Sequence, residues 1–327
     1  MRRAGGLRGV LGAFLILIGL GASSHAQEPW SPTRPIRLVL GYTPGGAADA
    51  VARDLAPLME KSLGQPVIVD YKPGAGGAIA AEMVATAAPD GYTIGLVDGA
   101  PLSIIPHARK VSYDPTASFS YLGVVSKAPL VVLVHPSVPA NNLQELLVLA
   151  RAQPGAVSYS TSGLGSIHQM AAELLSANTQ TSLLHVPYKG AAPALNDLMA
   201  GSVKVSFATI APAVPLVQSG RVRAIAVTSA RAVPAFPGAK PIGEQGVAGY
   251  DAQGWFVLAG PKGMPAEIVR KINAALNSAL QTPALRDKFI SQGNDVAPGT
   301  PEAATELVGV DFRKWGRVIR DQNLRFD

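Results

Sequence analysis

Short apolar runs alternate with segments of helical spacing through most of the chain. The runs of strand length are residues 36–42, 67–71, 93–97, 130–135, 157–160, 183–186, 203–207, 222–227 and 254–259. Apolar positions recur every three to four residues in segments between them, at 49–61, 77–87, 142–152, 166–177 and 192–200. This alternation predicts parallel sheets in an α/β fold. Residues 265–327 have a purely helical pattern, in which a helix is expected to begin at each of Pro265, Pro283 and Pro301.

The first 26 residues have the pattern of a secretory signal peptide. Three arginines precede an apolar run at residues 10–20, and the small residues that a signal peptidase reads stand at Ser24 and Ala26. The run is too short for a membrane span. We therefore expect cleavage after Ala26 and a periplasmic mature protein. The sequence contains no cysteine, so it offers neither a disulfide nor a lipid anchor at the cleavage point.

Composition narrows the class of protein. The 48% hydrophobic content is sufficient to bury a core, and the length after cleavage suits two domains. The three arginines of the signal peptide account for half of the formal net charge of +6, which argues against nucleic-acid binding. The modest remaining excess is compatible with an acidic ligand.

Two glycine-containing turns each follow a predicted strand and precede a predicted helix. They read PGGAAD after residues 36–42 and STSGLGSIH after residues 157–160. The first backbone N–H groups of a helix have no intrahelical partner and carry a partial positive charge, so such a turn can hold an anion without a basic side chain. Asp49 either caps the first helix or faces the ligand. In the second turn, Thr161, Ser162 and Ser166 add hydroxyl groups.

Motifs for other chemistries are absent from the sequence. There is no Walker loop, dinucleotide fingerprint or nucleophile elbow, so we expect no cofactor. The histidines lack metal-binding spacing, so we expect no metal site. His168 either reaches a bound ligand or holds its turn in place. A hydrolase that uses Ser166 and His168 is kept as a minor alternative to a non-enzymatic protein.

A series of motifs in a fixed order resembles one family over the whole mature chain. The series is PTRPIRLVL, PGGAAD, KPGAGGAIAAE, AAPDGYT, SYDP, HPSVPA, SYSTSGLGSIH, HVPYKGAAPALNDLMAG, SGRVRAIAVTSA and GWFVLAGPKGMP. It is similar to the substrate-binding receptors of tripartite tricarboxylate transporters, also called Bug receptors. The resemblance implies a two-lobed periplasmic binding protein, with a type II-like Venus-flytrap fold and a ligand cleft between its lobes.

The resemblance also implies a function and a site. Receptors of this kind close around a small organic acid and deliver it to the membrane subunits of a transporter, without performing chemistry on it. We expect a monomer with no nucleic-acid partner. A periplasmic sensor that presents its ligand to a signalling partner is the main alternative. The expected ligand-binding residues are Tyr42, Pro44, Gly45, Gly46, Asp49, Asp98, Gly99, Ala100, Thr161, Ser162, Gly163, Gly165, Ser166, His168, Tyr188, Lys189, Ala208 and Thr209.

The expected lobes are discontinuous in sequence. The first comprises residues 27–126 and 231–327, the second comprises 127–230, and the chain crosses between them at 126–129 and 228–231. The sequence also departs from the family pattern. Many relatives have Phe-Asp-Asn where this chain has Phe207-Ala208-Thr209. The missing carboxylate argues against a ligand with an ammonium group at that position.

Overall fold

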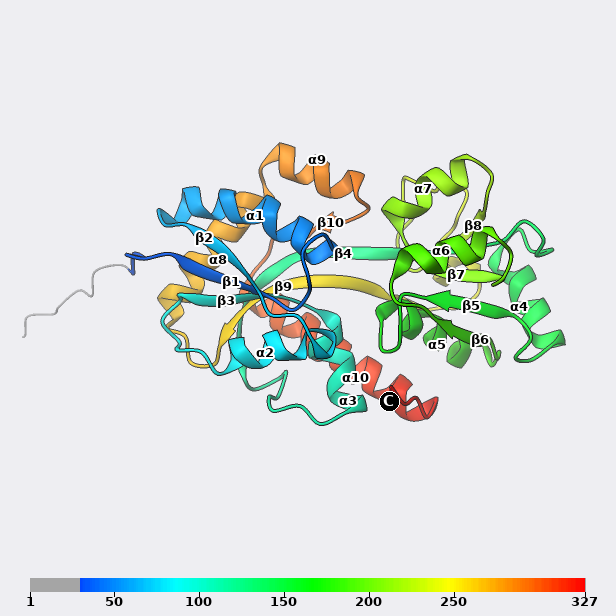
Figure 1. Ribbon diagram of the computed structural model, residues 1–327, viewed down its shortest axis with the longest axis horizontal. Helices are drawn as coiled ribbons and strands as arrows, with labels where there is room; N and C mark the ends of the chain where they lie inside the picture. The colour runs from blue at the N-terminus through cyan, green and yellow to red at the C-terminus, as the bar shows by residue number, and fades with distance from the viewer. Residues whose placement is uncertain (1–29, 327) are drawn as a thin grey trace, which may run out of the picture.

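The computed structural model describes residues 30–326, which form two lobes side by side (Figure 1). The predicted signal peptide and its cleavage point lie outside the described residues. No helix within residues 30–326 has both the length and the apolar character needed to cross a membrane.

The chain builds most of the first lobe before it enters the second. The elements of this first passage are β1 (Ile36–Leu40), α1 (Ala47–Leu63), β2 (Val67–Tyr71), the 3₁₀ turn η1 (Ala75–Gly77), α2 (Ala78–Ala85), β3 (Thr93–Asp98), the π-helical segment η2 (Ala100–Ile104) and α3 (Ile105–Ala108). The long strand β4 (Phe119–Val134) then runs from the first lobe into the second.

The second lobe follows, and the chain then returns to the first. The second-lobe elements are α4 (Leu143–Ala152), β5 (Ser158–Thr161), α5 (Ile167–Thr179), β6 (Leu184–Pro187), α6 (Ala191–Met199), β7 (Val205–Thr209), α7 (Ile210–Gln218), β8 (Arg223–Val227) and η3 (Ile242–Gln245). The returning elements are β9 (Gln253–Pro261), α8 (Ala266–Leu280), α9 (Pro283–Ser291), β10 (Asp295–Val296) and α10 (Pro301–Asp321).

Strand pairing sets the directions of the strands in both lobes. The first-lobe order is β2-β1-β3-β9-β4, and the second-lobe order is β4-β7-β5-β6, while β10 and β8 also pair with β4. β1, β2 and β3 are parallel to one another, as are β5, β6 and β7. The pairs β3–β9, β9–β4 and β4–β7 are all antiparallel. The two parallel groups therefore point in opposite directions, and their carboxyl ends meet between the lobes.

Helices cover both faces of each sheet. In the first lobe, α1, α8 and α9 pack on one face, around Leu55 and Ile272, and α2 packs on the other, around Val84 and Val257. In the second lobe, α4 and α5 enclose one buried cluster, and α6 and α7 enclose the other. Each lobe thus has its own core and can hold its strand ends in place.

Three sequence-based predictions about the sheets are wrong. The sheets are mixed rather than parallel, because β4 and β9 run against their neighbours. β4 is much longer than predicted, because Gly123, at a register shift, and Pro129 interrupt the apolar run that the sequence shows. The stretch after Pro265 is not purely helical, because β10 pairs with β4. The remaining predicted strands and the helices expected at Pro265, Pro283 and Pro301 are present.

The segment after β8 packs differently from the predicted division into lobes. Val233, Phe236 and Ala239 share a buried cluster with Val131 and Leu133 of β4, in the part that pairs with β7 and β8. Residues 242–252 likewise pack on the second-lobe sheet. These contacts favour a return crossing where β9 begins, rather than at residues 228–231.

Candidate functional site

The predicted site residues follow the carboxyl ends of five strands that point toward the space between the lobes. Residues 42–49 follow β1 and residues 98–100 end and follow β3, in the first lobe. Residues 161–168 end and follow β5, residues 188–189 follow β6, and residues 208–209 end β7, in the second lobe. In open α/β sheets, ligands bind in the crevice outside such strand ends. We call this region the inter-lobe site.

The turn between β1 and α1 is braced from within. The Gly45 N–H donates to Asp49 Oδ2 at 2.8 Å, and Gly45 adopts the left-handed φ of 92°. Arg53 Nε and the Tyr71 hydroxyl donate to Asp49 Oδ1 at 2.8 and 2.5 Å. Hydrogen bonds from Tyr71 and Gly45 hold the pKa of Asp49 below its usual value. Asp49 is buried, so its carboxylate fixes the turn from behind.

The start of α1 remains available to a ligand. The N-cap residue Gly46 has extended backbone angles, with φ −87° and ψ 179°, and its residue type provides no side chain to cap the helix. Thr43, Pro44, Gly45, Gly46 and Ala47 are all exposed. The turn and the first residue of a 17-residue helix are therefore exposed at the inter-lobe site, while Ala48 and Asp49 behind them are buried. An anion at this helix start would satisfy N–H groups that have no intrahelical partner.

A second glycine-rich loop supports this turn. A Cβ atom on Gly41 would lie only 2.6 Å from Gly77 Cα, so the two backbones pack against each other. The Tyr42 hydroxyl oxygen lies 3.4 Å from the Gly76 carbonyl oxygen. Positive φ angles extend over residues 74–77 and include Ala75 at 50°. The glycines of the PGAGG sequence therefore allow this loop to pack closely under the β1–α1 turn.

Tyr42 and Asp98 join the ends of β1 and β3. The Tyr42 hydroxyl donates to Asp98 Oδ2 at 2.7 Å. Asp98 Oδ1 is buried without a hydrogen-bond partner among the described residues. Burial raises the pKa of Asp98 to about 6, although the hydrogen bond from Tyr42 opposes that rise. Gly99 lies against the Trp255 ring, where a Cβ atom would be 3.2 Å from Cε2.

Hydroxyl groups of the second-lobe turn form hydrogen bonds within that lobe. The Ser166 hydroxyl donates to the Gly163 carbonyl at 2.7 Å and accepts from the Gln169 N–H, which caps α5. Ser162 Oγ shares a hydrogen bond of 2.8 Å with His168 Nδ1. Thr161 Oγ1 shares one of 2.7 Å with a second imidazole, His185. Ser166 and His168 therefore bond to different partners, which is not the geometry of a nucleophile and its base.

The last predicted residues lie on the neighbouring strand ends. The Tyr188 hydroxyl donates to Asp197 at 2.5 Å, and its N–H donates to the Thr161 carbonyl, so this residue ties β6 to β5. Lys189 is exposed. Thr209 occupies the N-cap position of α7 without a side-chain capping bond, next to buried Ala208.

His168 makes the stability of the protein dependent on pH. The ring is buried, and burial lowers its pKa from an ordinary 6.5 to about 4. Between these values the unfolded chain binds more protons than the folded chain, so the free energy of unfolding should rise with pH from about 4 to 6.5. The total gain is on the order of 3 kcal/mol.

Urea unfolding of wild type and His168→Asn at several pH values measures this effect. Burial also lowers the pKa of His185 to about 4, so the variant should retain part of the slope rather than lose all of it. Equal slopes for the two proteins would contradict the assignment to His168.

A sequence model described as "Tripartite tricarboxylate transporter family receptor" matches residues 51–324. The protein belongs to this family. It is 32% identical to Protein BugT of Bordetella pertussis over 96% of this chain and 97% of that protein. Family members are periplasmic solute-binding receptors, and the two-lobed fold agrees with that class.

Two solved structures with ligands resemble the receptor closely. Rpa4515 of R. palustris, with adipate, is 32% identical, with a TM-score of 0.76 over 88% of this chain and 97% of that one. MatC of Rhodopseudomonas palustris, with bound malate, is 29% identical, with a TM-score of 0.75 over 88% and 99%.

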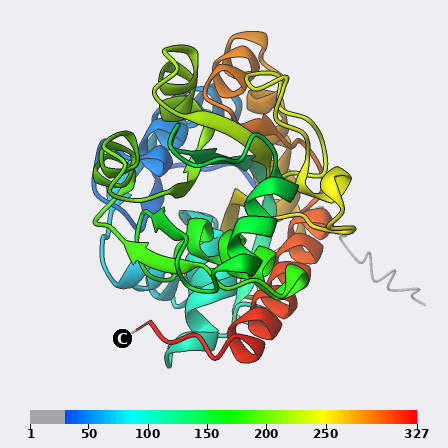
Figure 2. The same cartoon turned by 90° about the vertical axis from the view of Figure 1, so that its right-hand side faces the viewer.

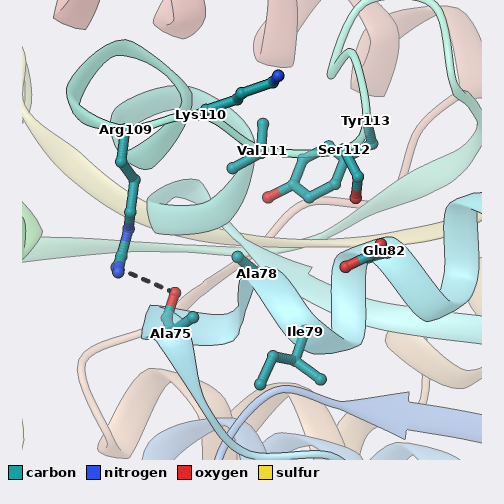
Figure 3. A pocket seen from close by; sticks show the side chains of 9 residues that line it. All are labelled: Ala75, Ala78, Ile79, Glu82, Arg109, Lys110, Val111, Ser112 and Tyr113. Carbon is teal, nitrogen blue, oxygen red and sulfur yellow. Dashed lines mark hydrogen bonds between the residues drawn. The ribbon is translucent and has the colours of Figure 1, made fainter.

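A cavity of about 410 Å³ lies in the first lobe of the receptor, and none of the predicted site residues lines it (Figure 3). It separates α2 from residues 109–113. Arg109 donates to the Ala75 carbonyl at 3.3 Å, and the Tyr113 hydroxyl donates to the Pro101 carbonyl at 2.7 Å. Both side chains thereby hold loops that support the β1 and β3 strand ends.

Several supporting residues of the receptor were missed by sequence reasoning. Arg53 stands four residues after Asp49 and Gln169 four residues after Gly165, which are detectable local spacings, whereas Tyr71 and Arg109 act through long-range contacts without a local pattern. Within residues 30–326, no group of His, Asp and Glu is arranged to hold a metal ion.

Proposed function

We propose that this receptor captures a small organic carboxylate at the inter-lobe site and delivers it to the membrane subunits of a transporter. The exposed start of α1 carries the proposal, because its free N–H groups lie where the strand ends of both lobes meet. Adipate and malate, which accompany the two similar structures, are both carboxylates. The proposed contacts come from Gly46 and the following N–H groups in the first lobe and from the 161–168 turn in the second.

Backbone donors suffice for useful affinity. Charge-assisted hydrogen bonds contribute about 1.5–3 kcal/mol each, so three or four can support micromolar binding after the costs of association. The guanidinium of Arg53, in α1, is already paired with Asp49. A carboxylate held by N–H groups therefore explains why this turn exposes glycines rather than a basic side chain.

Two features narrow the class of ligand. Ala208 replaces the carboxylate that many relatives have at the end of β7, which disfavours an ammonium group there. Burial raises the pKa of Asp98, so little free energy is needed to neutralise its carboxyl group when an anion enters nearby. Mono- and dicarboxylates without an amino group fit these surroundings best.

The membrane subunits of the transporter would recognise the closed state of the two lobes. β4 and β9 cross between the sheets as a paired ribbon, and such a ribbon can bend as a hinge. A ligand that touches both lobes stabilises the closed state through contacts that the open state lacks. We propose a monomer that acts in the periplasm after cleavage behind Ala26, and that has no catalytic role, since Ser166 and His168 do not pair.

A thermal-shift screen of residues 27–327 tests the ligand class. Mono-, di- and tricarboxylates are compared with amino acids and neutral sugars. A ligand at 100 times its Kd adds about 2.7 kcal/mol, which raises the Tm by a few degrees. A shift confined to carboxylates supports the proposal, and a shift with sugars alone contradicts it.

The sensor alternative predicts a different partner for the same closed state. Binding of the loaded receptor to reconstituted transporter membrane subunits, with ligand uptake into vesicles, would support delivery. Binding to the periplasmic domain of a sensor kinase, with no uptake, would favour the sensor.

A further inference from the structure

Helix α10 spans both lobes. Val308, near its start, packs into the first-lobe cluster that contains Trp255, whereas Trp315 and Ile319 pack into the second-lobe cluster of α4 and α5. The helix contacts η2 and α8 in the first lobe and α5 in the second. Figure 2 shows it along one side of the molecule. The chain end that follows α10 is thereby carried to the second lobe.

The short tail after α10 folds back on the second lobe. The Leu324 N–H donates to the Ile319 carbonyl at 2.9 Å, which turns the tail away from the helix axis. Leu324 and Phe326 are both half-buried against the second-lobe core. These contacts therefore set the direction of the tail.

Phe326 contacts the centre of the second-lobe turn. Its Cδ2 atom lies 3.5 Å from the place where a Cβ atom on Gly165 would be, and two more ring atoms lie within 3.9 Å. Gly165 is buried, has a φ of 69°, and donates its N–H to Gln169 Oε1 at 2.9 Å. The ring thus covers the left-handed residue that lies between Gly163 and the helix cap Ser166.

We propose that Phe326 is a positioning residue for the inter-lobe site, which holds the turn at residues 162–166 in its binding conformation from behind. This proposal rests on the proposed function only for its effect on affinity. Its effect on the turn itself can be measured in the free protein.

The physical reason is conformational entropy. Five of the six residues from Thr161 to Ser166 are glycine, serine or threonine, and such a segment has little intrinsic stiffness. Hydrogen bonds fix its two ends, at Ser162 and Ser166, while the Phe326 ring fills the space beside its middle. Without the ring, the turn must be ordered when the ligand binds, so affinity falls.

The test compares Phe326→Ala with Leu324→Ala. Both variants shorten a half-buried side chain of the same tail, but the three atoms nearest to a Cβ position on Gly165 all belong to Phe326. For Phe326→Ala we expect faster amide hydrogen exchange confined to residues 162–168 of the free protein. We also expect about 3- to 10-fold weaker binding of the carboxylate that stabilises the wild type, with little change in global unfolding. Phe326→Leu should keep most of the wild-type protection from exchange and most of the wild-type affinity.

The outcomes separate this inference from the proposed function. Unchanged exchange at residues 162–168 in Phe326→Ala would overturn the positioning role, whether or not a ligand is known. An equal change in Leu324→Ala would also overturn it, because the effect would then belong to packing of the tail as a whole. If wild type binds no carboxylate, the proposed function fails, while the exchange comparison still decides the role of Phe326.

Discussion

Gly46→Asp should abolish carboxylate binding while leaving the receptor folded. The substitution places a carboxylate at the N-cap of α1, where it can accept the helix N–H groups and repel an anionic ligand. We expect at least a 100-fold rise in Kd, because loss of two charge-assisted hydrogen bonds removes about 3 kcal/mol or more. The same aspartate should raise the free energy of unfolding by a few tenths of a kcal/mol, as a better cap than glycine.

The position tolerates the change sterically, which makes the result interpretable. Gly46 has a φ of −87°, and a Cβ atom there would meet only the Thr43 carbonyl, at 3.9 Å. Gly46→Asn is the matched control, since it has the same shape and caps the helix without a charge. Calorimetric titration of a ligand from the screen measures both variants. If Gly46→Asp bound the ligand with wild-type affinity, the binding site would have to lie away from the start of α1.

The local pattern of the sequence was sufficient to predict the positions of most strands and the turns between them. The predicted runs at residues 36–42 and 157–160 end within two residues of the ends of β1 and β5, at Leu40 and Thr161, and glycines follow because the chain must turn sharply. Since the carboxyl ends of parallel strands share an edge, the candidate residues could be grouped before any contact was known. The division of the chain after Thr228 was harder, because residues 233–252 contain no regular strand to show which sheet they cover.

Contacts between distant segments could not be predicted from the sequence. Tyr71 is the last residue of β2, and no sequence pattern around it indicates that its hydroxyl donates to Asp49, 22 residues earlier. Gly41 and Gly77 pack backbone to backbone, a contact that leaves no side chain to recognise. Hydrogen-bond partners of the serine hydroxyls were equally hidden, because any of several acceptors would satisfy them.

Asp311 is the clearest case of a residue whose importance appears only in three dimensions. It lies in α10 with a side chain that is almost fully buried. Its Oδ2 atom accepts from the indole N–H of Trp255 at 2.5 Å and from that of Trp315 at 3.2 Å, and its Oδ1 atom pairs with Lys314 at 2.7 Å. Trp255 belongs to the first-lobe core and Trp315 to the second, so one carboxylate connects the cores of both lobes.

Asp311→Ala should therefore be among the most destabilising single substitutions in the receptor. It leaves two buried indole N–H groups without their acceptor and removes the partner of Lys314, at a cost of about 3–5 kcal/mol. Denaturant unfolding followed by tryptophan fluorescence measures the loss.

Asp311→Asn should cost less, because its amide oxygen can still accept one indole N–H. Asp321→Ala, on the exposed end of the same helix, should change stability by no more than about 0.5 kcal/mol. If Asp311→Ala is as mild as Asp321→Ala, the carboxylate does not hold the two tryptophans together, and packing of the rings alone joins α10 to both lobes.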